Sequence, residues 1–190
     1  MSPGKESATA SSGQLTSPAL RALLQDGKLA GSLALDASRS EVRLKSMSVW
    51  GLLPVKGAFR QVTGNGTVSA AGEVTGTITV AAQSVDTKNK TRDQHLRSAD
   101  FFDIANHPDI TFTADGIRPE NGGVTVTGSL TIRGRTRPLS FGAKVSSAGG
   151  EVTLDGKVQV NRADFGLTWN RMGMVSMHNT ITVHAVFTRQ

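Results

Sequence analysis

The segment EVTLDGKVQV, residues 151–160, carries an apolar side chain or a glycine at every second position. Val152, Leu154, Gly156, Val158 and Val160 alternate with charged and polar residues. Side chains along a β-strand point alternately to its two faces, so this pattern predicts a strand with one buried and one solvated face. The segment is typical of a sheet that packs around a single core.

The same alternation recurs over residues 73–80, 124–132 and 180–188. Turn signals rich in Gly, Asn and Ala occur at 64–66, 71–72, 121–123 and 149–150. Sequential strands joined by short turns form an antiparallel meander, and closing that meander removes the exposed edges. The sequence therefore predicts an all-β fold, an antiparallel barrel of about eight strands.

The region before the strands lacks this alternation. Residues 1–16 are rich in Ser, Gly, Ala and Thr and are expected to form a flexible tail. Residues 17–27 predict a short helix, in which Ser17 caps the N-terminus, Pro18 takes the first helical position and Gly27 ends the helix. The apolar face of this helix would either plug one end of the barrel or simply pack against it.

Residues 30–190 are assigned to the barrel domain, which two stretches interrupt. Residues 87–108 are polar and then aromatic, and predict a helical excursion. Residues 161–178 combine aromatic residues with methionines and show little alternation. Long connections of this kind shape the mouth of a barrel.

Composition excludes several classes of protein. The chain has no cysteine, which rules out disulfides and cysteine-ligated metal centres. The net charge of +6 is dispersed and is not interleaved with exposed aromatics, so nucleic acid is not an expected partner. No apolar run suggests a leader or a membrane span, which predicts a cytoplasmic protein, or a periplasmic or secreted one if a leader has been removed.

Three inward faces carry a central glycine, at Gly76, Gly128 and Gly156. Missing side chains favour a hollow interior, but glycines also mark bulges and bends that close a sheet. If the interior is hollow, its aliphatic lining would bind hydrocarbon, and twenty buried carbons would contribute on the order of 16 kcal/mol before costs. The residues expected to contact such a ligand are Trp50, Leu52, Phe59, Ile78, Phe112, Val126, Leu130, Phe141, Val158, Phe165, Trp169 and Met174.

Seven short motifs, in this order and spacing, resemble the YceI family of lipid-binding, lipocalin-like barrels. They are SVDT at 84–87, RD at 92–93, HL at 95–96, DFFD at 100–103, PDITF at 108–112, GSLTIRG at 128–134 and RADFG at 162–166. The resemblance implies an extended eight-stranded barrel with a long tunnel. It also implies a polyisoprenoid, isoprenoid quinone or fatty-acid derivative as the ligand, a homodimer, and no defined enzymatic reaction.

The chain departs from the family pattern near its start. Arg39 stands where the family motif has a histidine, and a second common histidine is missing around residues 46–48. A headgroup site that uses those histidines therefore cannot be transferred to this chain. Arg39, Arg92 and Arg97 are the candidate headgroup contacts, because a cation suits a phosphate or a quinone oxygen.

One polar group has two interpretations. Asp93, His95, Asp100, Asp103 and His107 are residue types that bind divalent cations, but their spacing matches no metal motif, so no metal is expected. The alternative is structural, with Arg92 and Asp93 fixing a loop and the other aspartates capping turns.

No nucleophile motif is present. The sequence therefore predicts a binder or carrier without a cofactor other than a bound isoprenoid lipid, in transient contact with membranes. The alternatives are an enzyme acting on a bound lipid and a filled structural barrel without a ligand.

Overall fold

The structure, a computed structural model, describes residues 15–48, 51–120 and 122–190. Within these ranges the chain forms one antiparallel sheet and two α-helices, α1 (Ser17–Gln25) and α2 (Lys90–Arg97). The strands are β1 (Gly31–Leu35), β2 (Glu41–Ser48), β3 (Leu53–Phe59), β4 (Val62–Val68), β5 (Val74–Ala81), β6 (Val85–Asp86), β7 (Asp109–Glu120), β8 (Gly123–Ile132), β9 (Arg135–Ala148), β10 (Glu151–Asn161) and β11 (His178–Arg189). Short 3-10 helices span Ala82–Ser84, Arg162–Phe165 and Arg171–Gly173.

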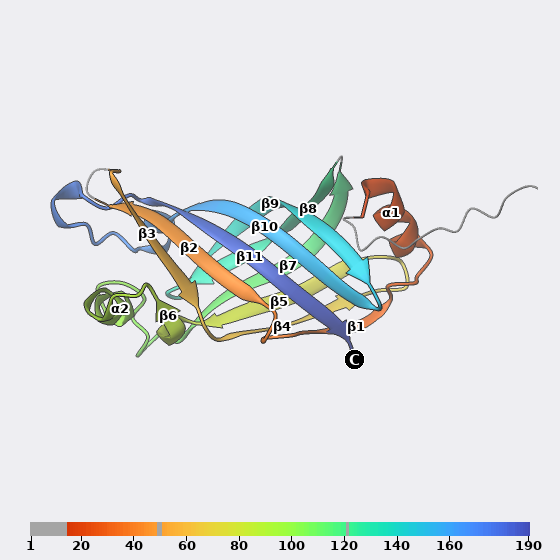
Figure 1. Cartoon of the computed structure of the whole chain (residues 1–190), viewed down its shortest axis with the longest axis horizontal. Coiled ribbons are helices and arrows are strands. Elements are labelled where there is room, and N and C mark those ends of the chain that lie inside the picture. The colour runs from red at the N-terminus through yellow and green to blue at the C-terminus, as the bar shows by residue number, and fades with distance from the viewer. Residues whose placement is uncertain (1–14, 49–50, 121) are drawn as a thin grey trace, which may run out of the picture.

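The sheet closes on itself. Strand β1 pairs with β4 on one side and with β11 on the other, which completes the ring β1-β4-β5-β7-β8-β9-β10-β11. All of these pairings are antiparallel. The predicted eight-stranded antiparallel barrel is confirmed (Figure 1).

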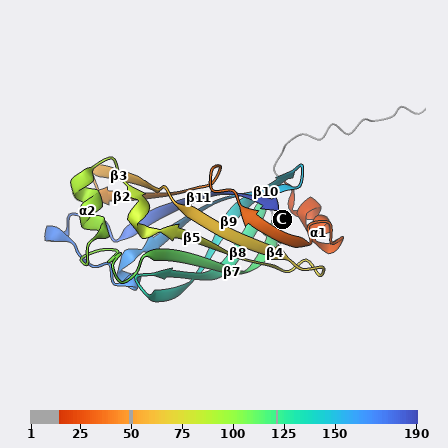
Figure 2. The same ribbon diagram turned by 90° about the horizontal axis from the view of Figure 1, so that it is seen from below.

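Three further strands lengthen the barrel at one end. β11 pairs with β1 through residues 187–189 and with β2 through residues 180–184, so β1 and β2 lie end to end along the same neighbour. β3 and β4 are arranged in the same way, because β3 pairs with β2 and β4 pairs with β1. The result is an elongated barrel with α1 at one end and α2 at the other (Figures 1 and 2).

The alternation in the sequence sets the inward face. Val80, Leu130, Ile132 and Val160 belong to one buried cluster, while Val124 and Val126 belong to a second one nearer to α1. Their polar neighbours in the sequence are more exposed. The period of two therefore identified the core face of these strands correctly.

Helix α1 closes one end of the barrel. Leu20 and Leu24 are 4% and 7% exposed and pack into the second cluster. The prediction that Ser17 caps this helix is wrong: Thr16 occupies the N-cap position without a side-chain bond, and the Ser17 hydroxyl donates to the carbonyl of Gly123 at 3.3 Å. The hydroxyl thus ties the helix to β8. The tail predicted for residues 1–16 lies largely outside the described residues.

The turn predicted at residues 64–66 is also wrong, because these residues lie in the middle of β4. A Cβ atom on Gly64 would stand 2.7 Å from the carbonyl oxygen of Thr77 on β5. Gly64 is therefore needed for the close approach of two strands. The turn signals at 71–72 and 149–150 fall between strands, and the excursion predicted at 87–108 contains α2. Of the signal at 121–123, Gly123 begins β8 and residue 121 lies outside the described residues.

A network of ion pairs links the β1–β2 connection to the start of β10. The Asp36 carboxylate accepts hydrogen bonds from the Ser38 hydroxyl at 2.6 Å and from Arg39 Nε at 2.7 Å. The Arg39 guanidinium also donates two bonds to Glu151, at 2.7 and 3.0 Å. The bond from Ser38, followed by that from Arg39, lowers the pKa of Asp36 to about 2.

This network predicts a loss of stability in acid. Because the folded-state pKa of Asp36 lies below its ordinary value, its contribution is complete above about pH 4 and is lost as the pH falls toward 2. We expect the urea midpoint of the D36N variant to fall less between pH 6 and pH 2.5 than that of the wild type. An equal fall in both proteins would contradict this assignment.

Candidate functional site

The barrel encloses a cavity of about 410 Å³. Leu20 and Leu24 of α1 line it at one end, and His95 of α2 and Trp169 line it at the other. Since the two helices lie at opposite ends of the molecule, the cavity runs along the barrel axis (Figure 2). Its volume is in the range of pockets that hold small organic ligands.

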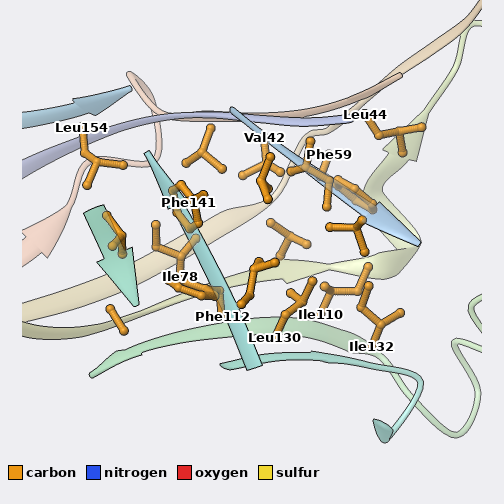
Figure 3. A pocket seen from close by; sticks show the side chains of 18 of the residues that line it. Val42, Leu44, Phe59, Ile78, Ile110, Phe112, Leu130, Ile132, Phe141 and Leu154 are labelled. Atoms are coloured by element: carbon orange, nitrogen blue, oxygen red, sulfur yellow. The ribbon is translucent and has the colours of Figure 1, made fainter. Parts of the chain in front are cut away.

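The lining is mostly hydrocarbon. Figure 3 shows aliphatic and aromatic side chains from several strands pointing into a common space. Those labelled are Val42, Leu44, Phe59, Ile78, Ile110, Phe112, Leu130, Ile132, Phe141 and Leu154. No Asp, Glu or Lys lines the cavity in the described part of the chain. An apolar space of this kind excludes water and favours a ligand with a long hydrocarbon part.

The glycines on the inner faces of the strands differ in the space beside them. A Cβ atom on Gly128 or Gly156 would stand 2.9 or 2.7 Å from the ring of Phe112 or Phe141, respectively. These two glycines make room for aromatic rings, so they do not leave empty space. By contrast, a Cβ atom on Gly66 would meet nothing closer than 3.6 Å, and Gly66 lines the cavity.

The structure brings together most of the residues that the sequence suggested as ligand contacts. Those that line the cavity are Phe59, Ile78, Phe112, Val126, Leu130, Phe141, Val158 and Trp169. Phe165 is buried outside it, Met174 is half-buried in the loop before β11, and Leu52 is 75% exposed. Trp50 lies outside the described residues. Contact with a ligand stays a prediction for each of them.

The three arginines suggested for a headgroup are separated. Only Arg92 lines the cavity. Arg39 is held by Asp36 and Glu151 at the β1–β2 connection, and Arg97 donates to the carbonyls of Gln83 and Val85 at 2.7 and 2.9 Å. Arg39 and Arg97 are therefore occupied by contacts away from the cavity.

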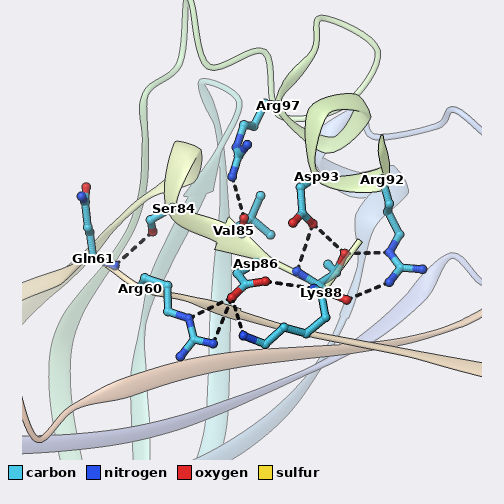
Figure 4. Close-up of polar contacts among 10 residues, drawn as sticks. Arg60, Gln61, Ser84, Val85, Asp86, Lys88, Arg92, Asp93 and Arg97 are labelled. Atoms are coloured by element: carbon cyan, nitrogen blue, oxygen red, sulfur yellow. Dashed lines mark hydrogen bonds and ion pairs between the residues drawn. The ribbon is translucent and has the colours of Figure 1, made fainter. Parts of the chain in front are cut away.

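The SVDT and RD motifs build a structural network that holds α2 to the barrel (Figure 4). Asp93 is 7% exposed, and its Oδ1 accepts from the backbone N–H of Thr87 at 3.0 Å and from the Thr87 hydroxyl at 2.6 Å. Arg92 donates to the hydroxyl and the carbonyl of Thr87, at 2.8 and 2.9 Å. This is the structural alternative considered from the sequence.

Asp86 completes the same network from strand β6. It accepts from Arg60 at 3.0 Å and from the Lys88 side chain at 3.0 Å. Bonds from the Lys88 backbone and side chain, and then from Arg60, hold the pKa of Asp86 well below its usual range. The carboxylate is thus used to fix the segment between β5 and α2.

The five Asp and His residues of the polar group do not converge. Asp93 is bonded to Thr87, whereas the Asp103 carboxylate accepts from the Asn106 side chain. His95 Nε2 lies 3.6 Å from an Asp100 carboxylate oxygen. Within the described residues, no three His, Asp or Glu side chains are placed to hold a metal ion.

Sequence reasoning missed Arg162, which is 2% exposed and lines the cavity. Its guanidinium donates to the carbonyls of Ser176 and Trp169, at 3.0 and 2.9 Å, and also to that of Leu167. Its Cζ atom lies 5.3 Å from the centre of the Phe101 ring. Burial lowers the pKa of Arg162. The only available signal was its place in the RADFG motif.

In the described chain, neither helix has the length and apolar character needed to cross a bilayer. The closed, elongated barrel and its dry axial cavity define the chain as a lipocalin-type barrel. More specifically, the chain belongs to the YceI-like domain family, whose model matches residues 33–187.

Sequence and structure comparisons agree with this assignment. The protein YceI of Salmonella arizonae is 34% identical over 99 residues, which cover 48% of this chain and 51% of that protein. The chain therefore spans about half the length of the curated relatives it matches.

Among solved structures, Burkholderia cenocepacia BcnA superposes with a TM-score of 0.73 and 25% identity, over 80% of this chain and 98% of that one. A polyisoprenoid-binding domain from Saccharophagus degradans, implicated in plant cell wall breakdown, superposes with a TM-score of 0.67 and 17% identity, over 83% and 98% of the two chains. The second likeness concerns the fold alone.

Proposed function

We propose that this protein binds one long-chain apolar or amphiphilic lipid inside its barrel and sequesters or transports it. The observation that carries the proposal is the apolar cavity of about 410 Å³ along the barrel axis. Each buried methylene contributes roughly 0.8 kcal/mol, so a long tail binds tightly even after the cost of its lost freedom.

An isoprenoid tail is the proposed form of the ligand. The likeness of the fold to a polyisoprenoid-binding domain supports this choice, as does a lining that mixes branched aliphatic side chains with aromatic rings. A filled structural barrel is disfavoured by the cavity itself. An acid–base pair of Asp93 with His95 is disfavoured because Asp93 is engaged by Thr87.

Solvent extraction of the purified protein, followed by mass spectrometry, tests the proposal directly. We expect one long-chain lipid class at near-equal stoichiometry with the protein. A protein denatured before purification and carried through the same steps serves as the control for adventitious lipid. A lipid-free extract, together with no uptake of lipid added to the folded protein, would contradict the proposal.

We also propose that the lipid enters and leaves at the α2 end, during transient contact with a membrane. Large apolar side chains are exposed there: Leu52, Leu53 and Met172 are 75%, 56% and 77% exposed. The hairpin tip between β2 and β3 and the loop before β11 lie at this end (Figure 1), joined by a bond from Ser176 N to Met47 O. Exposed apolar groups beside a lipid cavity favour contact with a bilayer.

Replacing Leu53 and Met172 by serine is expected to slow the transfer of a fluorescent lipid from vesicles at least severalfold, because the variant loses apolar area for bilayer contact. Its affinity for the same lipid, measured without vesicles, should stay unchanged. The double variant A19S/A22S, on the exposed side of helix α1 at the opposite end of the barrel, is the control. Equal transfer rates in all three proteins would contradict lipid entry and exit at the α2 end.

A further inference from the structure

The arginine and histidine side chains that line the cavity lie toward its α2 end. Among the described residues, one buried side-chain polar atom has no hydrogen-bond partner, the hydroxyl of Ser46, and Ser46 lines the cavity. A buried hydroxyl without a partner destabilises the fold, because it has given up its hydrogen bonds to water. The cost is recovered when a ligand supplies an acceptor at that position.

A second polar side chain lines the cavity near this point of the sheet. The pairing of β2 with β11 ends at Lys45 opposite Thr180, and Ser46 and Asn179 are the next residues on the two strands. Asn179 also pairs with Val160 of β10, and both of these residues line the cavity. The hydroxyl and the amide therefore share one inward row of the sheet.

Nitrogen-bearing side chains gather at the same end. Arg92, His95 and Arg162 line the cavity, and no carboxylate does so in the described part of the chain. The centre of the His95 ring lies 4.2 Å from that of the Trp169 ring and 6.1 Å from that of the Phe101 ring. Arg162 lies over the same Phe101 ring. These contacts join α2 to the loop that follows β10.

The charge of Arg162 is not balanced by an acid. Its guanidinium donates to backbone carbonyls, and within the described residues none of its hydrogen bonds reaches a carboxylate. Asp164, two residues along the chain, is exposed. Of the acids in α2 and the segment after it, Asp93 accepts from Thr87 and Asp100 lies beside His95. A buried cation without a counter-ion is costly, so an anion that reached this end would be stabilised.

We propose that this end of the cavity, formed by Ser46, Asn179, Arg92, His95 and Arg162, binds the anionic headgroup of the ligand, a carboxylate or a phosphate. The tail then runs toward Leu20 and Leu24 under α1. This inference rests on the proposed function and adds the charge of the ligand and its direction in the barrel.

Binding of hexadecanoate and its methyl ester tests the inference, because the two probes share one tail and differ in charge. Each is measured by displacement of a fluorescent apolar probe at pH 8. We expect hexadecanoate to bind at least tenfold more tightly than the ester. In S46V, which removes the hydroxyl and adds the same bulk against both probes, that ratio should fall about tenfold, because a bond to a charged group is lost.

The variant T182V on the neighbouring strand is the matched control, since Thr182 is exposed and points outward. Its ratio should equal that of the wild type. Equal affinity for acid and ester, or an unchanged ratio in S46V, would overturn the headgroup site and leave the proposed function standing. If neither probe binds, the proposed function fails.

Competition with inorganic phosphate separates a lipid headgroup from a free anion as the occupant of the site. We expect phosphate to displace neither the apolar probe nor hexadecanoate, which assigns the site to a lipid headgroup. Displacement by phosphate would overturn that assignment.

The direction of the ligand has its own readout. A hexadecanoate with a photoreactive diazirine near its methyl end should label Leu20 or Leu24, whereas one with the diazirine near the carboxylate should label residues of α2 or the loop before β11. The reverse pattern, or the same labels from both probes, would overturn the proposed orientation.

Discussion

Replacing Gly128 by alanine is expected to lower the free energy of unfolding by about 3 kcal/mol. A Cβ atom at this position would stand 2.1 Å from the carbonyl oxygen of Thr113 and 2.9 Å from the Cα of Ala114, both on β7. Backbone atoms of a paired strand cannot move aside as a flexible side chain can. Urea unfolding of the purified variant measures the change.

The matched control for this substitution is Gly142→Ala. Gly142 also lies within a strand of the barrel, is exposed, and has no atom within 4 Å of a Cβ built on it. Its variant should change stability by less than about 1 kcal/mol, in the stabilising direction. Similar losses in both variants would mean that β-strand glycines matter here for some reason other than close approach.

The largest effect on binding is expected from Gly66→Leu. Gly66 lines the cavity, and a Cβ atom there meets only ordinary contacts, with Leu33 and the Thr75 carbonyl. A leucine side chain would occupy space for roughly three methylene groups of the ligand, worth ~2.4 kcal/mol, or about fiftyfold in affinity. Displacement of a fluorescent apolar probe by hexadecanoate gives the affinity.

Stability separates a blocked cavity from a damaged fold. Because the added side chain fills apolar space, the urea midpoint of G66L should equal or exceed that of the wild type. The T67L variant, which adds bulk on the exposed side of the same strand, should bind as the wild type does. Unchanged affinity in G66L would show that the ligand does not use the middle of the barrel.

The sequence was informative wherever one periodic pattern decides the structure. Alternation alone placed Val80, Leu130 and Val160 on the inner face, because a strand with one buried face has no other register available. It also indicated which residues line the cavity, since every inward side chain of a hollow barrel faces the same space. The resemblance to the YceI family added the extended shape of the barrel.

The sequence was less informative where neighbouring segments decide the role of a residue. Glycines at 64–66 resemble a turn, yet they lie within β4, because the partner strands approach closely there. Arg39 and Arg97 resembled candidates for a headgroup, but Glu151 and two backbone carbonyls, distant in sequence, engage them. No local sequence pattern predicts these hydrogen-bond partners.

Ser46 and Arg162, at the α2 end of the cavity, show most clearly that local sequence does not reveal partners from other segments. Ser46 is one of many serines, and only the register of β2 against β11 places it inside the barrel without a partner. Arg162 lines the cavity because the loop after β10 wraps its carbonyls around the guanidinium. Both facts depend on contacts between segments that no spacing in the chain predicts.

The position of β11 in the sheet has a consequence for the order of folding. This strand bonds to β10 on one side and to both β1 and β2 on the other, and it includes the pair between Leu33 and Arg189. During synthesis the ring therefore stays open until β11 has emerged from the ribosome. Until then the apolar inner faces of the earlier strands are exposed to water, so folding should be slow and sensitive to chaperones.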